Sequence, residues 1–467
     1  MMNEKNHKLP KDGSLAIENK SDGHIRFVSF NVNGVKTLFN YHPWTSFSSQ
    51  FDPAFDFLKA DIISLQELKL SSTTLKDLKI VSLKNYKSFI SLPRIKKGYS
   101  GVGLFVRIPN DKEDLTVKSS LRVVKAEEGV SGFLKSPEDP SKCYRDLPEN
   151  DSIGGYPLID NTLGVELDKE GRCICIELAS KLVVFSVYCP ANSSQTEIGE
   201  TYRMNFLRAL LERCYNLKYV LNKEVVVLSD INVCVDLIDH ADELNTRVKN
   251  NLVTNPILLG SPNSGNLFER ANIEECIKFK SSTPARKLLN SYVVQSENFK
   301  DLSTDRNFLF DSTRIKQERR MNMFTVWNTL TNARQSNYGS RIDLILASSE
   351  IMCNSISRAN ILPSIMGSDH CPVFTDFDSI SISQNRDIQL TTVPEKLKFE
   401  AKYYYNLDRY HDISQMFKAG AIKRGKHKLE KSSDEPRNEQ SPSENMKTSR
   451  KRAKMKTISD YFSKNNS

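Results

Sequence analysis

Short apolar runs alternate with longer amphipathic stretches between residues 25 and 378. The runs RFVSFNV, ADIISL, VGLFVR, CICIEL, KLVVFSVY, EVVVLSD, RIDLILA and PVFTDF are rich in β-branched or aromatic residues, and polar or turn residues bound each of them. This composition and length predict β-strands. Many of the runs are apolar on both faces, which is typical of sheets covered on each side. The pattern therefore predicts an α/β domain in which packed sheets lie between outer helices.

The stretch 202–221 has a different period. Met204, Leu207, Leu211, Cys214 and Leu217 recur in it at the spacing of one helical face. We therefore expect a long helix here that packs one side on the domain.

Both ends of the chain differ from this body. Residues 1–24 are polar and lack the apolar segment of a secretory signal, so they are predicted to form a disordered arm. Residues 379–467 carry 19 Lys and Arg against 11 Asp and Glu, which places +8 of the chain's net charge of +9 in this segment. Such a composition predicts a mostly disordered basic tail. A near-neutral body with a basic tail suggests a domain held near a polyanion.

The cysteines and the hydropathy argue against a disulfide-bonded protein and against a membrane protein. The nine cysteines are scattered without a C-x-x-C pair, which favours a reducing compartment and speaks against a zinc site. No apolar stretch approaches the ~20 residues that span a bilayer. We therefore expect neither disulfides nor a membrane protein.

Polar side chains recur at the ends of the predicted strands. One such residue often serves only the backbone of a turn, but six strand ends carry carboxylate, carboxamide, phenol or imidazole groups. They are Asn31, Asn33, Gln66, Glu67, Tyr188, Asp230, Asn232, Asp343, Asp369 and His370. Their oxygens suit Mg²⁺, with Mn²⁺ as the alternative, and Mg²⁺ commonly pairs with phosphates. Hydrolysis of a phosphodiester needs such a metal, a carboxylate base and a His or Tyr donor, and the sequence supplies each of them.

The motifs SFNVNG, QELK, GYSGVGLF, VYCP, SDINV, NARQSNYGSRID and GSDHCP, in this order, resemble those of the exonuclease III / class II AP endonuclease family. This family belongs to the endonuclease/exonuclease/phosphatase superfamily. VYCPANS, LIDHADEL, SSTPARKLLN and NYGSRID resemble its second eukaryotic branch, which is known in yeasts. The resemblance covers residues 25–378 and implies a four-layer α/β sandwich with its active site where loops of the two sheets converge.

The resemblance also implies a role for each residue at the metal. Glu67 matches the principal metal carboxylate, and Asp369 and Asn33 match residues close to the same ion. Asp230 and Asn232 are expected to contribute to metal binding as well.

The remaining roles concern the scissile phosphate. Asp230 matches the residue that activates water, and His370 matches the histidine that contacts the phosphate. Asp343 matches the carboxylate that orients this histidine. The other expected catalytic residues are Asn232, Tyr188 and Asn31.

Two positions that would line the pocket for the abasic sugar depart from the family pattern. The major AP endonucleases carry a tryptophan and a phenylalanine that line the pocket for the flipped-out abasic sugar, and here the corresponding residues are Ser340 and Val326. Because stacking walls help to hold an extruded nucleotide, we expect a wider pocket that suits a 3′ terminus.

Basic residues beside these motifs are candidates for contacts with DNA phosphates. Five lie in the predicted loops and one lies in the motif before Asp343. They are Lys36, Lys69, Arg94, Lys96, Lys97 and Arg341.

The tail contains a peptide that resembles sliding-clamp (PCNA) ligands. In MKTISDYFSK, residues 455–462 present Ile458, Tyr461 and Phe462 at the required spacing, although Met455 stands where glutamine is usual. An apolar cluster in a disordered tail is best explained by the groove of a partner.

The sequence thus predicts a nuclear, monomeric DNA repair nuclease. It would act on double-stranded DNA with abasic sites or blocked 3′ ends. The alternatives are an RNA deadenylase or a phosphoinositide phosphatase of the same superfamily, and a clamp-binding scaffold with a vestigial nuclease body.

Overall fold

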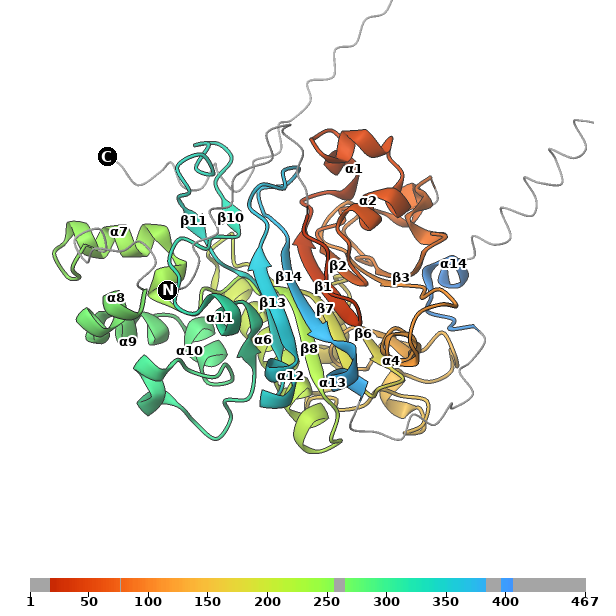
Figure 1. Cartoon of the computed structure of the whole chain (residues 1–467). Coiled ribbons are helices and arrows are strands. Elements are labelled where there is room, and N and C mark those ends of the chain that lie inside the picture. Colours follow the sequence, from red (N-terminus) through yellow and green to blue (C-terminus); the bar gives the residue numbers. More distant parts are fainter. Residues whose placement is uncertain (1–16, 76, 256–264, 384–395, 406–467) are drawn as a thin grey trace, which may run out of the picture. The chain divides into compact units, whose positions relative to one another are not determined.

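Two six-stranded mixed sheets form the centre of the protein (Figure 1). The computed structural model describes residues 17–75, 77–255, 265–383 and 396–405. The first sheet has the order β13 (Ile356–Ile361), β14 (Val373–Asp378), β1 (His24–Asn31), β2 (Ile62–Gln66), β4 (Val102–Arg107) and β3 (Tyr86–Ser91). The second has the order β5 (Val123–Glu128), β6 (Cys173–Leu178), β7 (Val183–Tyr188), β8 (Val225–Asp230), β12 (Asp343–Ala347) and β9 (Phe310–Asp311). A two-stranded ribbon pairs β10 (Val326–Trp327) with β11 (Gly339–Ser340).

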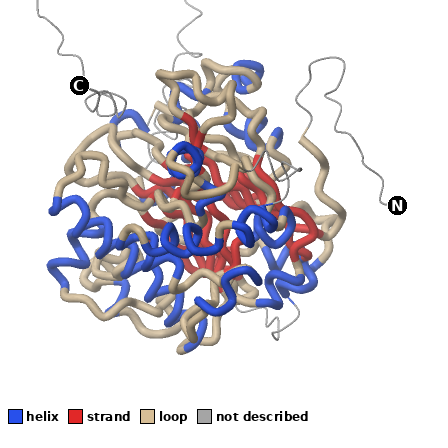
Figure 2. Tube along the Cα trace, turned by 90° about the vertical axis from the view of Figure 1, so that its left-hand side faces the viewer, coloured by secondary structure: helices blue, strands red, loops and turns tan. Residues whose placement is uncertain are grey.

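The helices lie outside the sheets, as Figure 2 shows. Those of the first half are α1 (Val35–Leu38), α2 (Phe51–Phe57), α3 (Ser72–Leu75), α4 (Leu115–Ser120), α5 (Asn161–Asp168) and α6 (Glu197–Tyr219). Those of the second half are α7 (Ala241–Lys249), α8 (Gly265–Ala271), α9 (Ile273–Ser281), α10 (Pro284–Asn290), α11 (Ser312–Gln317), α12 (Glu350–Asn354), α13 (Ser379–Ser383) and α14 (Ala401–Tyr404). In the described part of the chain, no helix is long and apolar enough to cross a membrane.

The alternation of side chains along each strand explains why the sheets are covered on both faces. In β7, Val184 points into the core between the two sheets, which it shares with Phe27 of β1. Its neighbours Val183 and Phe185 instead join the core under α6, where Phe206 packs. This arrangement requires apolar residues at consecutive strand positions.

An aromatic cluster covers the outer face of the first sheet. The ring centroid of Phe55 on α2 lies 4.8 Å from that of Phe105 on β4, and Trp44 stacks on Phe30 of β1. The two sheets are therefore flanked by helices, which confirms the predicted α/β sandwich. Eight predicted runs correspond to β1, β2, β4, β6, β7, β8, β12 and β14, and the amphipathic stretch 202–221 lies largely in α6.

The folded body extends past the boundary predicted at residue 378. After β14 the chain forms α13, and Ile382 joins the core between the sheets. Residues 396–405 pack on the edge strand β3, where Glu400 forms a backbone bridge with Phe89, and Phe399 is buried. At the other end, Lys20 contacts Asp61, so part of the predicted arm belongs to the body. Most of residues 1–24 and of the tail lie outside the described residues.

We expect a chain that ends at residue 395 to be less stable than one that ends at residue 405. The shorter chain loses the buried side chains of Leu397 and Phe399, which contribute about 3 kcal/mol in total to the free energy of unfolding. Urea denaturation of the two truncated chains and of the full chain measures the difference. Equal unfolding midpoints would show that residues 396–405 do not stabilise the domain.

Candidate active site

The register of the strands brings the predicted site residues together. Asp343 at the start of β12 lies directly opposite Asp230 at the end of β8, and Tyr188 at the end of β7 also pairs with Asp230. In the other sheet, Asn31 at the end of β1 pairs with Gln66, which precedes Glu67. The loop before β14 adds two further residues to the same place, because β14 runs antiparallel to β1.

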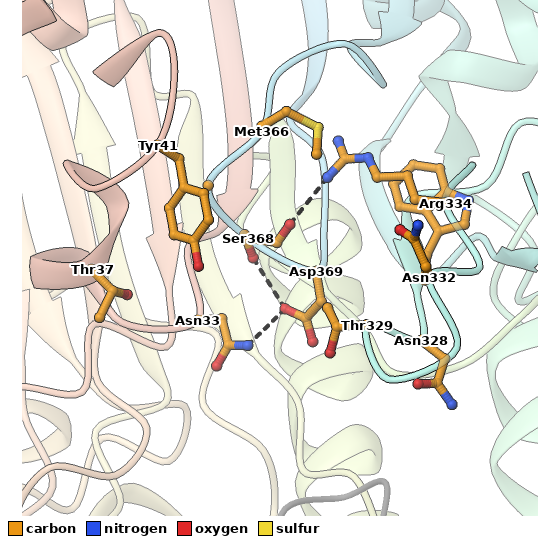
Figure 3. A pocket seen from close by; sticks show the side chains of 12 residues that line it. Asn33, Thr37, Tyr41, Asn328, Thr329, Asn332, Arg334, Met366, Ser368 and Asp369 are labelled. Atoms are coloured by element: carbon orange, nitrogen blue, oxygen red, sulfur yellow. Dashed lines mark hydrogen bonds between the residues drawn. The ribbon is translucent and has the colours of Figure 1, made fainter. Parts of the chain in front are cut away.

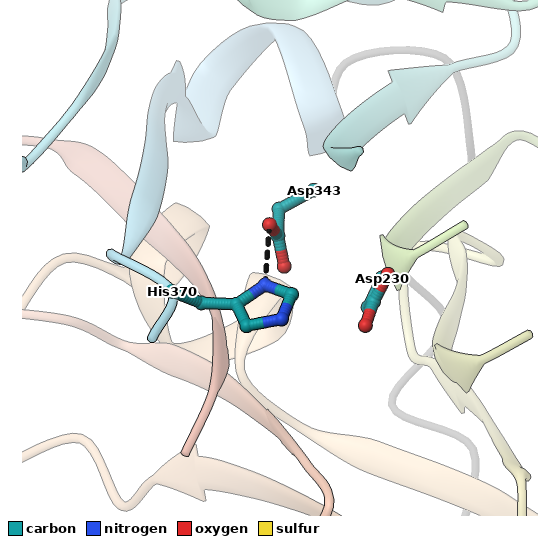
Figure 4. A group of neighbouring side chains, drawn as sticks. All are labelled: Asp230, Asp343 and His370. Carbon is teal, nitrogen blue, oxygen red and sulfur yellow. Dashed lines mark hydrogen bonds and ion pairs between the residues drawn. The ribbon is translucent and has the colours of Figure 1, made fainter. Parts of the chain in front are cut away.

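His370 and Asp343 form a buried pair (Figure 4). The imidazole Nδ1 lies 2.8 Å from Asp343 Oδ2, and the two side chains are only 6% and 0% exposed. Burial alone would lower the pKa of His370, but the charge and hydrogen bond of Asp343 raise it to about 10. The ring is therefore an imidazolium at neutral pH, and its Nε2 carries a second hydrogen that can be donated to an anion.

Asp230 lies beside this pair. Ligand atoms of Asp230, Asp343 and His370 lie within 4.8 Å of one another. Burial, and after it the charge of Asp343, raises the pKa of Asp230 to about 8. Asn31 donates hydrogen bonds of 2.8 Å to Asp230 and 2.9 Å to Glu67, so one amide joins the two carboxylates. A carboxylate with a pKa near neutral pH suits a general base.

A second group of oxygens could hold a divalent cation. Asn33 donates to Asp369 Oδ1 at 2.9 Å (Figure 3), and the Lys69 ammonium lies 2.9 Å from Glu67 Oε2 and also contacts Asn33 Oδ1. Burial opposes ionisation of Glu67, but the Lys69 charge and the Asn31 hydrogen bond hold its pKa below the ordinary value. Ionised carboxylate and amide oxygens fit Mg²⁺, and a hollow of about 420 Å³ lies beside Asn33 and Asp369.

Several residues of the site adopt a backbone conformation that non-glycine residues rarely take. The φ angles are 46° at Asn33, 53° at Glu67, 52° at Lys69 and 54° at Asn232. Left-handed residues cluster where the surrounding structure holds a functional side chain in place. At Asn232, the amide donates to the Cys189 carbonyl at 2.9 Å and its own backbone N–H donates to Asp230.

Two arginines that were not predicted contact residues of the site. The guanidinium of Arg172 lies 4.7 Å from the ring centre of Tyr188 and donates to the hydroxyl of Tyr99 at 2.5 Å. Arg334 donates to backbone carbonyls of the loop that carries Asp369 and His370. The only signal for Arg172 in the sequence was its place directly before the apolar run CICIEL. The signal for Arg334 was its place inside the motif NARQSNYGSRID.

The predicted DNA contacts divide into three groups. Lys36, Lys96 and Lys97 are exposed, as that role requires. Lys69 points to the oxygens of Glu67 and Asn33, and Arg94 pairs with Glu128 at 3.1 Å. The prediction for Arg341 is wrong, because its side chain is 1% exposed and bridges Asp239 and Asp311 at 2.8 and 2.6 Å. Its guanidinium ties the start of β12 to the body and is not accessible to DNA.

The positions that lack aromatic residues lie next to His370. Val326 pairs with Ser340 across the ribbon and also forms a backbone bridge with His370. Both side chains are half-buried. The predicted partner-binding residues Ile458, Tyr461 and Phe462 lie outside the described residues.

Comparison with known proteins gives three informative similarities, although no family model matches the chain. DNA-(apurinic or apyrimidinic site) endonuclease 2 of Saccharomyces cerevisiae is 42% identical over 410 residues, which cover 86% of this chain and 75% of that protein. The protein of the same name from Schizosaccharomyces pombe is 33% identical over 353 residues, and the match spans 75% of this chain and 58% of that protein. Among solved structures, the catalytic domain of Xenopus laevis APE2 has a TM-score of 0.56 at 25% identity and covers 81% of this chain and 97% of that domain.

Proposed function

Since this chain belongs to the exonuclease III-type family of DNA-(apurinic or apyrimidinic site) endonuclease 2, we propose that it is a DNA repair nuclease. It hydrolyses phosphodiesters in double-stranded DNA at abasic sites and at blocked or mismatched 3′ ends. The family membership argues against the RNA and phosphoinositide alternatives. Glu67, Asp230, Asp343 and His370 are all present, and this complete set argues against a clamp-binding scaffold with a vestigial nuclease body.

The observation that carries the proposal is the buried His370–Asp343 pair beside Asp230. His370, held as an imidazolium, donates Nε2–H to a non-bridging phosphate oxygen and stabilises the charge that develops there. Asp230 takes the proton of the attacking water, and its raised pKa of about 8 makes it a competent base.

Glu67, Asp369 and Asn33 would hold the metal ion of this reaction, Mg²⁺ or alternatively Mn²⁺. When bound, the ion supplies positive charge to the phosphoryl group and the leaving oxygen. Asn31 keeps the metal carboxylate and the base at a fixed separation, because its amide bonds to both.

A direct experiment compares purified protein on two duplexes, one with an internal abasic analogue and one with a 3′-blocked nick. We expect both to be cut in Mg²⁺ and neither in excess EDTA, with faster removal of the 3′ block. Activity that persists in EDTA would contradict the metal-dependent mechanism, and cleavage of RNA or phosphoinositides alone would contradict the substrate.

Ser340→Trp tests why 3′ processing should be the stronger activity. An aromatic wall beside His370 would add about 1 kcal/mol of stacking to an extruded nucleotide. We expect incision at abasic sites to rise about fivefold relative to 3′ processing. Ser340→Ala is the matched control and should leave the ratio unchanged. If the tryptophan variant also leaves it unchanged, other residues set the pocket.

We further propose that the tail recruits the protein to the sliding clamp in the nucleus. The double variant Tyr461→Ala/Phe462→Ala should abolish stimulation by the clamp on primed circular DNA, because it removes the apolar anchor without changing charge. Activity on short oligonucleotides should remain. If stimulation instead depends only on Arg450, Lys451, Arg452 and Lys454, the tail is an electrostatic tether to DNA.

A further inference from the structure

The loop of residues 363–370, which carries Asp369 and His370, turns several backbone carbonyls toward one side chain. Arg334 Nη2 donates to the carbonyls of Pro363 and Ile365 at 2.9 and 2.7 Å. Its Nη1 donates to the Ser368 carbonyl at 3.0 Å (Figure 3) and to the His370 carbonyl at 3.4 Å. One guanidinium thus satisfies four acceptors that span the whole loop.

Arg334 is itself held in place. Its guanidinium carbon lies 4.5 Å from the ring centre of Trp327, a cation–π contact that fixes the plane of the donors. The ring is anchored in turn, because Trp327 Nε1 donates to Asn337 at 3.1 Å and its backbone N–H donates to the Asp369 carbonyl at 3.0 Å. Arg334 therefore links the segment between β10 and β11 to the loop before β14.

The other contacts of the loop each hold a single position, such as the His370–Asp343 pair, the hydrogen bond from Asn33 to Asp369 and the backbone bridge of His370 with Val326. Trp44 donates to the Met366 carbonyl at 2.7 Å, and Gly367 has a φ of 109°, which other residues rarely adopt. Without Arg334, the four carbonyl groups would have no hydrogen-bond donor between them. The loop would then rearrange until water could hydrogen-bond to these carbonyls.

We infer that Arg334 is a positioning residue, which fixes the 363–370 loop so that Asp369 reaches the metal while His370 reaches the phosphate. The inference rests on the proposed function, because it assigns these two roles to neighbouring residues of one loop. Lysine cannot replace Arg334, since an ammonium is a point donor, whereas the planar guanidinium spreads its donors toward four separate carbonyls.

The test uses the full chain with Arg334→Lys and Arg334→Ala. Because a misplacement of about 1 Å can cost on the order of 10²-fold in rate, we expect kcat for 3′-block removal to fall by about that factor in both variants. KM should change little, since Lys36, Lys96 and Lys97, the exposed lysines proposed to contact DNA, remain. Arg320→Ala, which removes an exposed arginine charge away from the loop, is the control and should behave as the wild type.

Chemical rescue separates positioning from a general loss of stability. Methylguanidinium at millimolar concentration should restore part of the kcat of Arg334→Ala, and methylammonium should not. Equal rescue by both cations, or a Lys variant with wild-type kcat, would overturn the inference. So would a loss confined to KM.

A second measurement does not depend on nuclease activity. The imidazole NMR signals of His370 should broaden or split in Arg334→Lys, and the affinity for Mg²⁺ measured by calorimetry should fall. If the wild type shows no nuclease activity, the proposed function fails while these signals still report on the loop. Unchanged His370 signals together with unchanged Mg²⁺ affinity would contradict the positioning role alone.

Discussion

Replacing Glu67 with alanine is expected to lower the rate of phosphodiester hydrolysis on the order of 10³-fold or more. Glu67 is the carboxylate at the centre of the oxygen group that would hold the metal, with Asn31 and Lys69 bonded to its two oxygens. Without it, the site would lose its principal charged ligand, and the metal that would supply positive charge to the phosphoryl group would bind weakly.

The loss should come from the metal and not from the fold. Calorimetry should show a matching loss of Mg²⁺ affinity in Glu67→Ala, whereas the unfolding midpoint should change little. Glu166→Ala is a suitable control, because Glu166 also pairs with a nearby lysine, Lys169, but lies on α5 outside the site. Near-normal activity of Glu67→Ala in Mg²⁺ would contradict the metal assignment.

The central strands could be predicted from the sequence because their apolar runs identify them without knowledge of which distant residues pack on them. β6 and β8 are apolar at consecutive positions, and such runs are strands in almost any context of packed sheets. β3 (YKSFIS) and β13 (ISRANI) were missed, since strands at the edge of a sheet alternate with polar residues and resemble loops in sequence.

The candidate site was predictable to the extent that its residues end or begin strands. The strand ends that carry Asn31, Glu67, Asp230, Asp343 and His370 all converge. The arginines were not predictable in this way, because their roles depend on partners far along the chain. Arg341 stands in the motif beside Asp343, but its partners Asp239 and Asp311 are 102 and 30 residues away.

The C-terminal boundary of the domain could not be predicted from composition either. Residues 396–405 carry Lys and Glu like the rest of the tail, so composition assigned them to it. Their place on the body depends on tertiary contacts, such as the packing of Phe399 and the backbone bridge between Glu400 and Phe89.

Asp343→Asn is expected to lower turnover by on the order of 10²-fold or more, because it removes the charge that keeps His370 protonated. In the wild type, Asp343 raises the pKa of His370 to about 10 against the effect of burial. In the variant burial remains and the Asp343 charge is lost, so the pKa of His370 should fall, although the charges of Asp369 and Asp230 still raise it. A larger fraction of His370 would then be neutral and a weaker donor to the phosphate.

The sign of the pH dependence follows from this shift. His370 is active when charged, so the alkaline decline of the wild-type rate should lie near pH 10, and in Asp343→Asn this decline should move to lower pH. Asp230 is active when ionised, so the rate should also fall as pH drops below about 8. NMR titration of the His370 imidazole measures the pKa itself, and His24→Asn, at the start of β1, is the control histidine variant. His370→Asn should lose a similar factor in kcat while Mg²⁺ affinity is retained. If His370→Asn raises KM and leaves kcat unchanged, His370 binds the substrate without stabilising the transition state, and the role proposed for the pair is wrong.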